Sequence, residues 1–378
     1  MSMTTSSLFT PLQVGDLHLA HRVVLAPLTR MRSTQPGDVP NALNATYYGQ
    51  RASKGGLLIS EATQISLEGK GYPATPGIYS PEQVEGWKLV TEAVHAKGAY
   101  IFAQLWHVGR ISHTSLHPAE GLPVSSSAIA PADGKTFTAQ FQMADFETPR
   151  ALELNEIPRI IAAYRQAAEN ARAAGFDGVE IHGANGYLPD QFLEDGVNQR
   201  TDEYGGSKEN RARFLLEAVD AAIEIWGSGR VGVRLSPYGT ANGMSDSDPV
   251  TLFSYVLGQL SARGIAYAHL VEPRASKAGG GAPTDDSAPH TAEIFRKAFH
   301  GVLISAGGYT GPTAAEVVSS GYADAVAFGR WFIANPDLPQ RLKLGAELNP
   351  YDRRTFYGGT EKGYTDYPTL AEVPAIKA

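Results

Sequence analysis

A short stretch near the middle of the chain carries three side chains that could act together on one reacting group. His182, Asn185 and Tyr187 follow directly after the apolar run Gly178–Ile181, and two glycines among them permit a sharp turn. An imidazole and a carboxamide can both donate hydrogen bonds to one electronegative atom, and a phenol can donate a proton. These residue types at this spacing indicate polarisation of a carbonyl or nitro group together with protonation of a neighbouring carbon. A polar turn that caps the next helix is the alternative.

The elements that must position these side chains form a regular alternation of short apolar runs and amphipathic helical patterns. Several runs are almost continuously apolar, as strands buried on both faces should be. Eight strand–helix units without a break in composition favour one (β/α)8 TIM barrel as a single domain over residues 1–378. A doubly wound sheet is the alternative, but it seldom uses eight such regular units. The predicted strands are Arg22–Pro27, Gly56–Glu61, Ala99–Leu105, Gly178–His182, Val231–Leu235, Ala266–Val271, Val302–Ala306 and Ala325–Gly329.

Capping residues mark helices between these strands. Ser80, Pro81 and Gln83 form a capping box with proline at the first helical position. Asp248-Pro249 begins another helix, and Asn155 is predicted to begin a third.

Two segments lie outside the repeat. Residues Leu12–His21 resemble a small hairpin that would cover the bottom of the barrel. Residues Trp106–Leu152 form a long insertion after the third strand, rich in Ser, Pro and Gly. Insertions of this length usually serve as lids or binding loops.

Glycines and hydrogen-bonding side chains gather at the strand ends, where such barrels place their active sites. Glycines after the seventh and eighth strands allow backbone N–H groups to approach a phosphate, and Arg330 can add a charge-assisted contact. Gln104 presents a donor and an acceptor to a heterocycle edge, and Arg234 needs an anionic partner if it is buried. Together these groups indicate FMN. The three glycines are Gly307, Gly308 and Gly329.

Each of these residues also has a structural interpretation. The glycines are compatible with ordinary turns between strand and helix, and Arg234 could form an ion pair inside the barrel with Glu61 or Glu180. His269, inside the sixth strand, is predicted to be a core histidine with its hydrogen bonds satisfied.

The composition excludes several classes of protein. The chain has 378 residues and a formal charge of −7 without a basic block, so nucleic acid is not an expected partner. It has no cysteine, which excludes disulfides, thiol nucleophiles and cysteine-ligated iron–sulfur clusters. The ten histidines lack metal-ligand spacing, so no metal site is predicted. With neither a signal pattern nor a long apolar run, the chain is expected to be cytoplasmic, without a membrane partner.

Longer motifs then occur in a fixed order: Ala26–Arg30, Gln104–Arg110, His182–Leu188, Asn198–Ser207, Glu209–Arg211, Phe356–Gly359 and Gly363–Pro368. On these motifs the chain resembles the Old Yellow Enzyme family from Leu8 to Leu370, and in particular the bacterial branch that includes pentaerythritol tetranitrate reductase and the xenobiotic reductases. The segments Ala241–Pro249 and Glu272–His290 depart from those relatives.

The resemblance implies an FMN-dependent ene-reductase that accepts hydride from NADPH or NADH. In a ping-pong cycle, hydride would pass from flavin N5 to the β-carbon of activated alkenes such as enones, enals, maleimides and nitroalkenes. The resemblance also allows reduction of nitrate esters or nitroaromatics. A monomer or weak homodimer is expected.

The resemblance also assigns roles to residues. His182 and Asn185 would polarise the activating group of the substrate, and Tyr187 would protonate the α-carbon. The substrate pocket would include Tyr72, Trp106 and Tyr357. On the cofactor, Thr29 would form a hydrogen bond with flavin O4, Gln104 would bind the pyrimidine edge, and Arg234 would bind the N1/O2 region. The backbones of Pro27 and Ala62 would contact the ring. The phosphate would be held by Gly307, Gly308, Gly329 and Arg330.

Three rival functions remain at this point, and one is a barrel that binds FMN without turnover, which the intact set of His182, Asn185 and Tyr187 argues against. A flavin barrel that oxidises a hydroxy acid or dihydroorotate would need a different base. A phosphate-binding lyase or isomerase without flavin would need a catalytic lysine or a carboxylate–histidine pair at strand ends, and the sequence does not reveal one.

Overall fold

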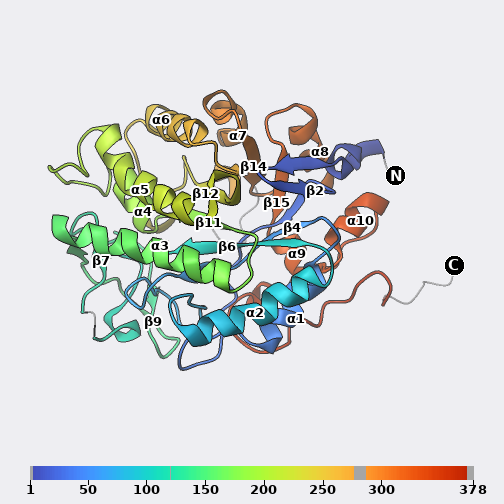
Figure 1. The fold of residues 1–378 in the computed structure, drawn as a ribbon, viewed down its shortest axis with the longest axis horizontal. Coiled ribbons are helices and arrows are strands. Elements are labelled where there is room, and N and C mark those ends of the chain that lie inside the picture. The colour runs from blue at the N-terminus through green and yellow to red at the C-terminus, as the bar shows by residue number, and fades with distance from the viewer. Residues whose placement is uncertain (1–2, 120, 276–286, 373–378) are drawn as a thin grey trace.

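Eight parallel strands close into a barrel in the computed structural model, which describes residues 3–119, 121–275 and 287–372 (Figure 1). Pairing of the last strand with the first completes the ring, which confirms the predicted (β/α)8 barrel. A doubly wound sheet would leave two free edges and is therefore excluded. The strands are β3 (Val23–Leu25), β4 (Leu57–Ile59), β6 (Tyr100–Trp106), β11 (Gly178–Gly183), β12 (Val231–Leu235), β13 (Tyr267–Val271), β14 (Val302–Ala306) and β15 (Ala325–Phe328).

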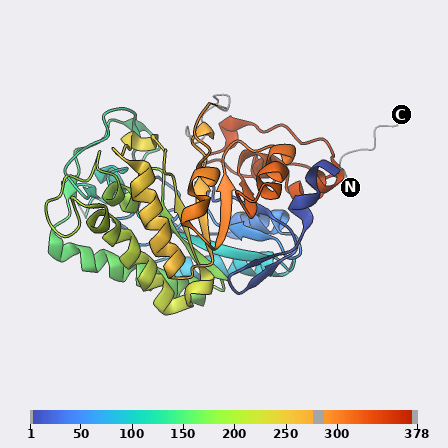
Figure 2. The ribbon, with the colours of Figure 1, turned by 90° about the horizontal axis from the view of Figure 1, so that it is seen from above.

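Helices flank the strands on both sides, as Figure 2 shows for the green and yellow helices on one flank and the orange and red helices on the other. Ser80 and Gln83 form the predicted capping box of α2, and the Asp248 side chain caps α6. The helices are α1 (Ala42–Arg51), α2 (Pro81–His95), α3 (Ile157–Ala173), α4 (Leu188–Leu193), α5 (Lys208–Trp226), α6 (Pro249–Ala262), α7 (Thr291–Phe295), α8 (Gly311–Ser319), α9 (Arg330–Ala334) and α10 (Leu338–Leu344).

The start of α3 differs from the prediction. Asn155 is not the cap but lies within a short 3₁₀ helix, η3 (Leu154–Glu156), that leads into α3. The Glu156 carboxylate accepts the Glu153 N–H at 2.8 Å and pairs with Arg150. Because this carboxylate satisfies an N–H at the start of the turn, helical backbone begins before Asn155.

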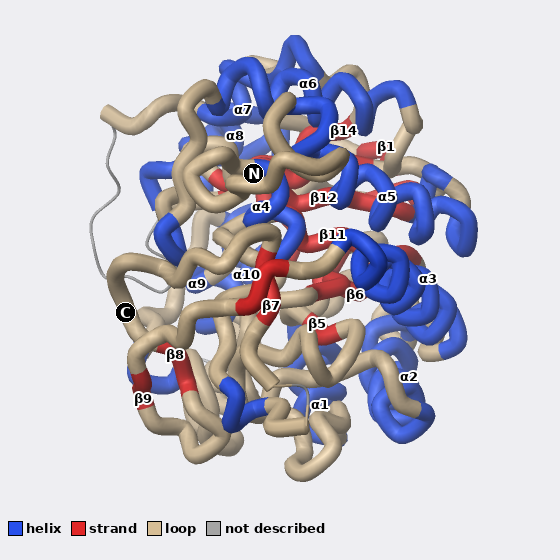
Figure 3. The backbone as a smooth tube through the Cα atoms, turned by 90° about the vertical axis from the view of Figure 1, so that its left-hand side faces the viewer, coloured by secondary structure: helices blue, strands red, loops and turns tan. Residues whose placement is uncertain are grey.

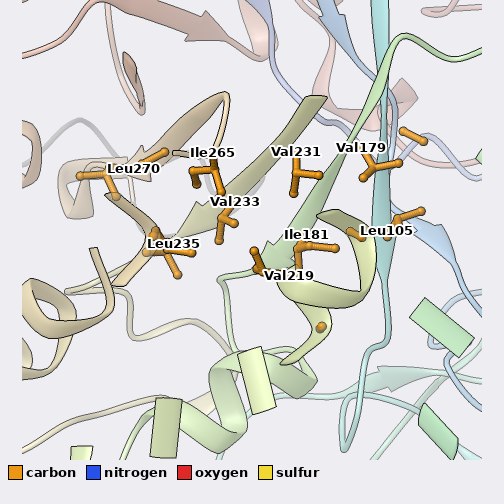
Figure 4. Packing of buried hydrophobic residues seen from close by; sticks show 14 of the residues in the cluster. Leu105, Val179, Ile181, Val219, Val231, Val233, Leu235, Ile265 and Leu270 are labelled. Carbon is orange, nitrogen blue, oxygen red and sulfur yellow. The ribbon is translucent and has the colours of Figure 1, made fainter. Parts of the chain in front are cut away.

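Alternation along the strands separates an outer apolar layer from the barrel interior. Val179 and Ile181 on β11, together with Val231 and Val233 on β12, belong to the cluster between barrel and helices, where Val219 of α5 joins them (Figure 4). The intervening side chains therefore face the interior. On β11 these are Glu180 and His182, so the strand itself delivers the first residue of the candidate site.

The bottom of the barrel is covered by the predicted hairpin of β1 (Leu12–Val14) and β2 (Leu17–Leu19). Val14 and Leu17 pack in one buried cluster with Phe102 from the barrel interior. The turn needs glycine at position 15, where φ is +51° and a Cβ would lie 2.0 Å from the Gly229 carbonyl oxygen.

The insertion after β6 contains two small strand pairs, β7 (Val124–Ser125) with β10 (Arg150–Ala151), and β8 (Thr136–Phe137) with β9 (Met143–Ala144). Figure 3 shows β8 and β9 among loops on the opposite side of the view from α2, α3 and α5. A further short strand, β5 (Thr63–Gln64), pairs with β6. Within the described residues, no helix combines the length and apolarity that a membrane span requires.

Candidate active site

His182 is held inside the barrel mouth in its neutral form. It lies opposite Arg234 in the register of β11 and β12, and its side chain is almost fully buried. Burial lowers the pKa of His182 well below 6.5, and the nearby charges of Arg234 and His269 act in the same direction. Its Nδ1 atom has no hydrogen-bond partner in the described part of the chain. A neutral imidazole with a free ring nitrogen can polarise an oxygen atom that binds beside it.

Tyr187 lies in an aromatic cluster beside His182. Its ring packs edge-on against His182 and against Trp106, with centroid separations of 5.0 Å in both cases. The hydroxyl groups of Tyr187 and Tyr72 are 3.2 Å apart, and Tyr72 stacks on Trp106 at 5.5 Å. Burial raises the pKa of Tyr187 well above 10, so this phenol is protonated at neutral pH. The arrangement keeps a proton available next to the polarising imidazole.

Other aromatic side chains border this cluster. Tyr357 is 48% exposed, and it lies near enough to Tyr72 and Tyr187 to raise the pKa of both phenols. Phe137 of β8 packs against Tyr72 at 5.9 Å, and Phe146 packs against the same cluster. The insertion thus contributes to the walls of the site, a role that only its length and composition indicated beforehand.

The barrel interior beneath this mouth contains a buried polar network. Gln104 Nε2 donates to Glu180 Oε1 at 2.7 Å, and His269 Nδ1 lies 2.9 Å from Glu180 Oε2. His269 was predicted to have its hydrogen bonds satisfied, and its Nδ1 atom has such a partner. Its Nε2 atom lacks a partner among the described residues. Glu180 and His269 are completely buried, and this carboxylate–histidine pair was not evident in the sequence because its members are 89 residues apart.

Arg234 does not form the ion pair that its alternative interpretation required. Neither Glu61 nor Glu180 lies within 4 Å of its guanidinium, and its Nε has no partner in the described chain. Glu180 is instead engaged by Gln104 and His269, and it acts on Arg234 only through its longer-range charge. Arg234 is partly buried, and a guanidinium in such a position without a contacting anion can be compensated by an anionic or electron-rich ligand edge.

The turn after β3 is fixed by a buried carboxylate. The Arg30 N–H donates to Glu61 Oε2 at 3.0 Å, which holds the peptide that follows Thr29. Burial raises the pKa of Glu61 to about 7, although the Arg30 N–H opposes this shift. Pro27 and Ala62 are buried beside this turn, whereas Thr29 is half-buried.

Arg30 also connects this turn to the C-terminal part of the chain. Its guanidinium donates to the carbonyl oxygens of Phe356 and Gly363, each at 2.9 Å. These contacts hold the segment that carries Tyr357 against the barrel mouth. This contact between the two motifs was not predictable from the sequence, because 326 residues separate Arg30 from Phe356.

The residues predicted to bind phosphate lie at the ends of β14 and β15. Gly307 and Gly308 have φ values of +123° and +68°, conformations that favour glycine. Arg330 begins α9 and lies over the Tyr351 ring at 5.7 Å, without an ion pair to any described carboxylate. α8 begins shortly after the two glycines, so its N-terminal N–H groups face the same end of the barrel. A cation without an ion pair beside glycine turns and a helix N-terminus suits an anion.

The structure thus brings the predicted residues to one end of the barrel, although the loop Glu272–His290 lies in part outside the described residues. A groove of about 830 Å³ between α1, α2 and residues 365–372 contains none of them.

Comparison with known proteins gives matches over nearly the whole chain. Residues 7–349 match the NADH:flavin oxidoreductase / NADH oxidase family. 12-Oxophytodienoate reductase 1 of Oryza sativa subsp. japonica is 52% identical over 368 residues, which cover 97% of this chain and 94% of the relative. Flavin oxidoreductase hxnT of Emericella nidulans is 47% identical over 387 residues, with 96% and 97% coverage.

Solved structures agree with these matches. Morphinone reductase in complex with tetrahydroNAD has a TM-score of 0.89 and 51% identity, covering 96% of this chain and 97% of that one. The old yellow enzyme homologue from Zymomonas mobilis has a TM-score of 0.90 and 45% identity, with 96% and 99% coverage.

Proposed function

The chain belongs to the NADH:flavin oxidoreductase / NADH oxidase family, which includes the Old Yellow Enzymes, and on this premise we propose that it reduces activated alkenes. It is an FMN-dependent oxidoreductase with a nicotinamide as hydride donor. The alkene substrate and the individual roles of the site residues are our proposal.

The side chains present fit FMN. Arg234 has an unpartnered Nε at the barrel mouth, and Arg330 lacks an ion pair among the described residues. Gln104 has committed its Nε2 to Glu180, so its Oε1 remains available to accept a hydrogen bond from a heterocycle N–H. We assign the cofactor to a set of residues that spans the barrel mouth: Pro27, Thr29, Ala62, Gln104, Arg234, Gly307, Gly308, Gly329 and Arg330.

When bound, FMN supplies the hydride chemistry of both half-reactions. The chain's own residues bind and activate the alkene. His182 and Asn185 donate hydrogen bonds to the carbonyl or nitro oxygen, where negative charge develops as the alkene accepts hydride. Donors fixed at that position stabilise the transition state more than the ground state.

Tyr187 then donates its proton to the α-carbon of the substrate. Its high pKa keeps the proton in place until the carbon becomes basic enough to accept it. The Tyr72 hydroxyl, 3.2 Å away, can donate a hydrogen bond to the phenolate that remains. Tyr72, Trp106 and Tyr357 line the side from which the substrate enters.

The observation that carries this proposal is the juxtaposition of a neutral imidazole and a protonated phenol above an arginine without a contacting anion. Relatives named as reductases of 12-oxophytodienoate and of morphinone support an alkene conjugated to a carbonyl group. We extend the proposal to enones, enals, maleimides and nitroalkenes, with nitrate esters or nitroaromatics as further substrates.

Anaerobic half-reactions test the function. The FMN-loaded protein is reduced with NADPH or NADH and then mixed with 2-cyclohexenone, N-methylmaleimide or a nitroalkene. The expected result is reoxidation of the flavin together with one equivalent of saturated product by mass spectrometry. A reduced enzyme that none of these compounds reoxidises would contradict the proposal, and oxidation of a hydroxy acid would favour the rival flavin barrel.

A further inference from the structure

The turn that carries Asn185 has an unusual backbone conformation. Asn185 and Gly186 have φ values of +60° and +80°, both in the left-handed region. Glycine adopts this conformation without a steric penalty, whereas asparagine does so at a conformational cost. Such a residue persists where the surrounding structure over-determines its backbone. The contacts of this turn should therefore reveal what holds Asn185 in place.

Four side chains form hydrogen bonds with the four backbone N–H and C=O groups of Asn185 and Gly186. Two of the side chains belong to the first turn of α4, one follows β12 and one lies in the 3₁₀ helix η5 (Ala241–Gly243). Each backbone N–H and C=O group of the turn thus has its own side-chain partner, and these partners come from three separate parts of the fold. The Asn185 N–H donates to Ser236 Oγ at 2.8 Å, Asn242 Nδ2 donates to the Asn185 carbonyl at 2.8 Å, the Gly186 N–H donates to Asp190 Oδ2 at 2.8 Å, and Gln191 Nε2 donates to the Gly186 carbonyl at 2.7 Å.

Asp190 acts on both residues of the turn. Its Oδ2 accepts the Gly186 N–H directly, and it also accepts the Ser236 hydroxyl at 3.4 Å. A hydroxyl group has one proton, so a serine that donates to Asp190 presents only lone pairs to the Asn185 N–H. Asp190 thereby orients Ser236 as an acceptor. The carboxylate is completely buried and approaches neither His182 nor Tyr187 through a hydrogen bond in the described structure.

We propose that Asp190 is a positioning residue that, through Ser236 and the Gly186 peptide, fixes the left-handed Asn185 for polarisation of the substrate. The inference rests on the proposed function of Asn185, and it adds a buried carboxylate that binds neither substrate nor cofactor. Its role is to hold the donor of the second hydrogen bond at the activating oxygen.

The surroundings of Asp190 make this support dependent on pH. Glu194 at the C-terminal cap of α4 and Asp246 after η5 add negative charge, whereas Arg110 from the insertion opposes it. Burial raises the pKa of Asp190 to about 7, and burial likewise raises the pKa of Glu194. Above pH 7 the ionised Asp190 accepts both hydrogen bonds strongly, because charged acceptors bind more tightly than neutral ones. As the pH falls through 7, protonation of Asp190 weakens its hydrogen bonds with the Gly186 N–H and the Ser236 hydroxyl.

Ligand binding to the FMN-loaded protein tests the inference without turnover. Phenol is titrated from pH 6 to pH 8.5, and binding is followed by the flavin absorbance. Asp190→Asn should reduce affinity by roughly 3- to 10-fold at pH 8.5, the range for one or two weakened hydrogen bonds. The ratio of wild-type to variant affinity should shrink towards pH 6, and this ratio cancels the titration of phenol itself. Asp195→Asn removes a charge at the end of the same helix without contacting the turn, and it should leave the affinity unchanged.

A double-mutant cycle separates positioning from a general structural role. If Asp190 acts through the Asn185 side chain, Asp190→Asn should have no further effect in the Asn185→Ala background but should keep its effect in the His182→Ala background. Ser236→Ala provides the same test if Asp190→Asn fails to fold. A full effect of both substitutions in the Asn185→Ala background would overturn the inference. A wild-type protein that binds phenol with this coupling but reduces no alkene would instead contradict the proposed function alone.

Discussion

The two ends of the candidate site differ in how the protein holds them. At the polarising turn, side chains of the protein satisfy every peptide N–H and C=O of Asn185 and Gly186. At the proposed phosphate end, Gly307 and Gly308 adopt positive φ values and Arg330 lacks an ion pair within the described chain. The protein itself satisfies the backbone of the first region, whereas the second has a charge that an anion would pair with.

This difference follows from what each region must bind. Substrates come and go in every cycle, so the groups that act on them have to be fixed by the protein itself. A resident cofactor can supply part of the order at its own site, because binding satisfies the groups that the protein leaves open. Substitutions at the turn should therefore impair chemistry without releasing FMN, and substitutions at the phosphate end should do the reverse.

The largest effect is expected for Tyr187→Phe, which removes a hydroxyl and keeps the ring that packs on Trp106. Loss of a general acid typically lowers the rate by about 10²–10⁴-fold. Stopped-flow measurements should show this loss for reoxidation by 2-cyclohexenone, with nearly normal reduction by NADPH and normal FMN content. Nitroalkenes should be less affected, because a nitronate is stable enough to take its proton from water. Enone reduction at the parent rate would show that another group is the acid.

A smaller loss is expected for His182→Ala and Asn185→Ala. Removal of one donor to a developing negative charge costs about 2.7–4 kcal/mol. Reoxidation by enones should slow accordingly, and phenol affinity should fall in both variants, while FMN remains bound. Unchanged phenol affinity in both variants would refute their assignment as a pair.

The two regions also differ in how far sequence could predict them. Apolar runs located all eight barrel strands, and the strand ends then indicated His182, Gln104 and Arg234 as candidate residues, since the site of a closed parallel barrel lies at those ends. The side chains that form hydrogen bonds with the Asn185 backbone were not predictable, because Ser236 and Asn242 lie 51 and 57 residues from Asn185. Periodicity shows which way a side chain faces but not which distant peptide it meets.

The phosphate end provides the converse test. Arg330→Ala should weaken FMN retention by about 1.5–3 kcal/mol, the range for hydrogen bonds to charged groups. Equilibrium dialysis of FMN measures this change, and the rate per bound flavin should remain close to that of the parent. Arg330→Lys is the matched control, since it retains the charge but not the bidentate geometry of the guanidinium. Its FMN affinity should lie between those of the parent and Arg330→Ala. FMN affinity equal to the parent in Arg330→Ala would place the phosphate elsewhere.

The smallest effect is expected for Tyr72→Phe, which probes how the proton donor is supported. The substitution retains the ring stacked on Trp106 and removes only the hydroxyl 3.2 Å from that of Tyr187. Since that hydroxyl can stabilise the phenolate left after proton transfer, its loss should cost about 0.5–1.5 kcal/mol, a few-fold decrease in enone reduction. In the Tyr187→Phe background no phenolate forms, so Tyr72→Phe should have no further effect there. Additive losses would mean that Tyr72 acts on the substrate itself, and the support of the proton donor would then have to come from its packing against Trp106 and His182.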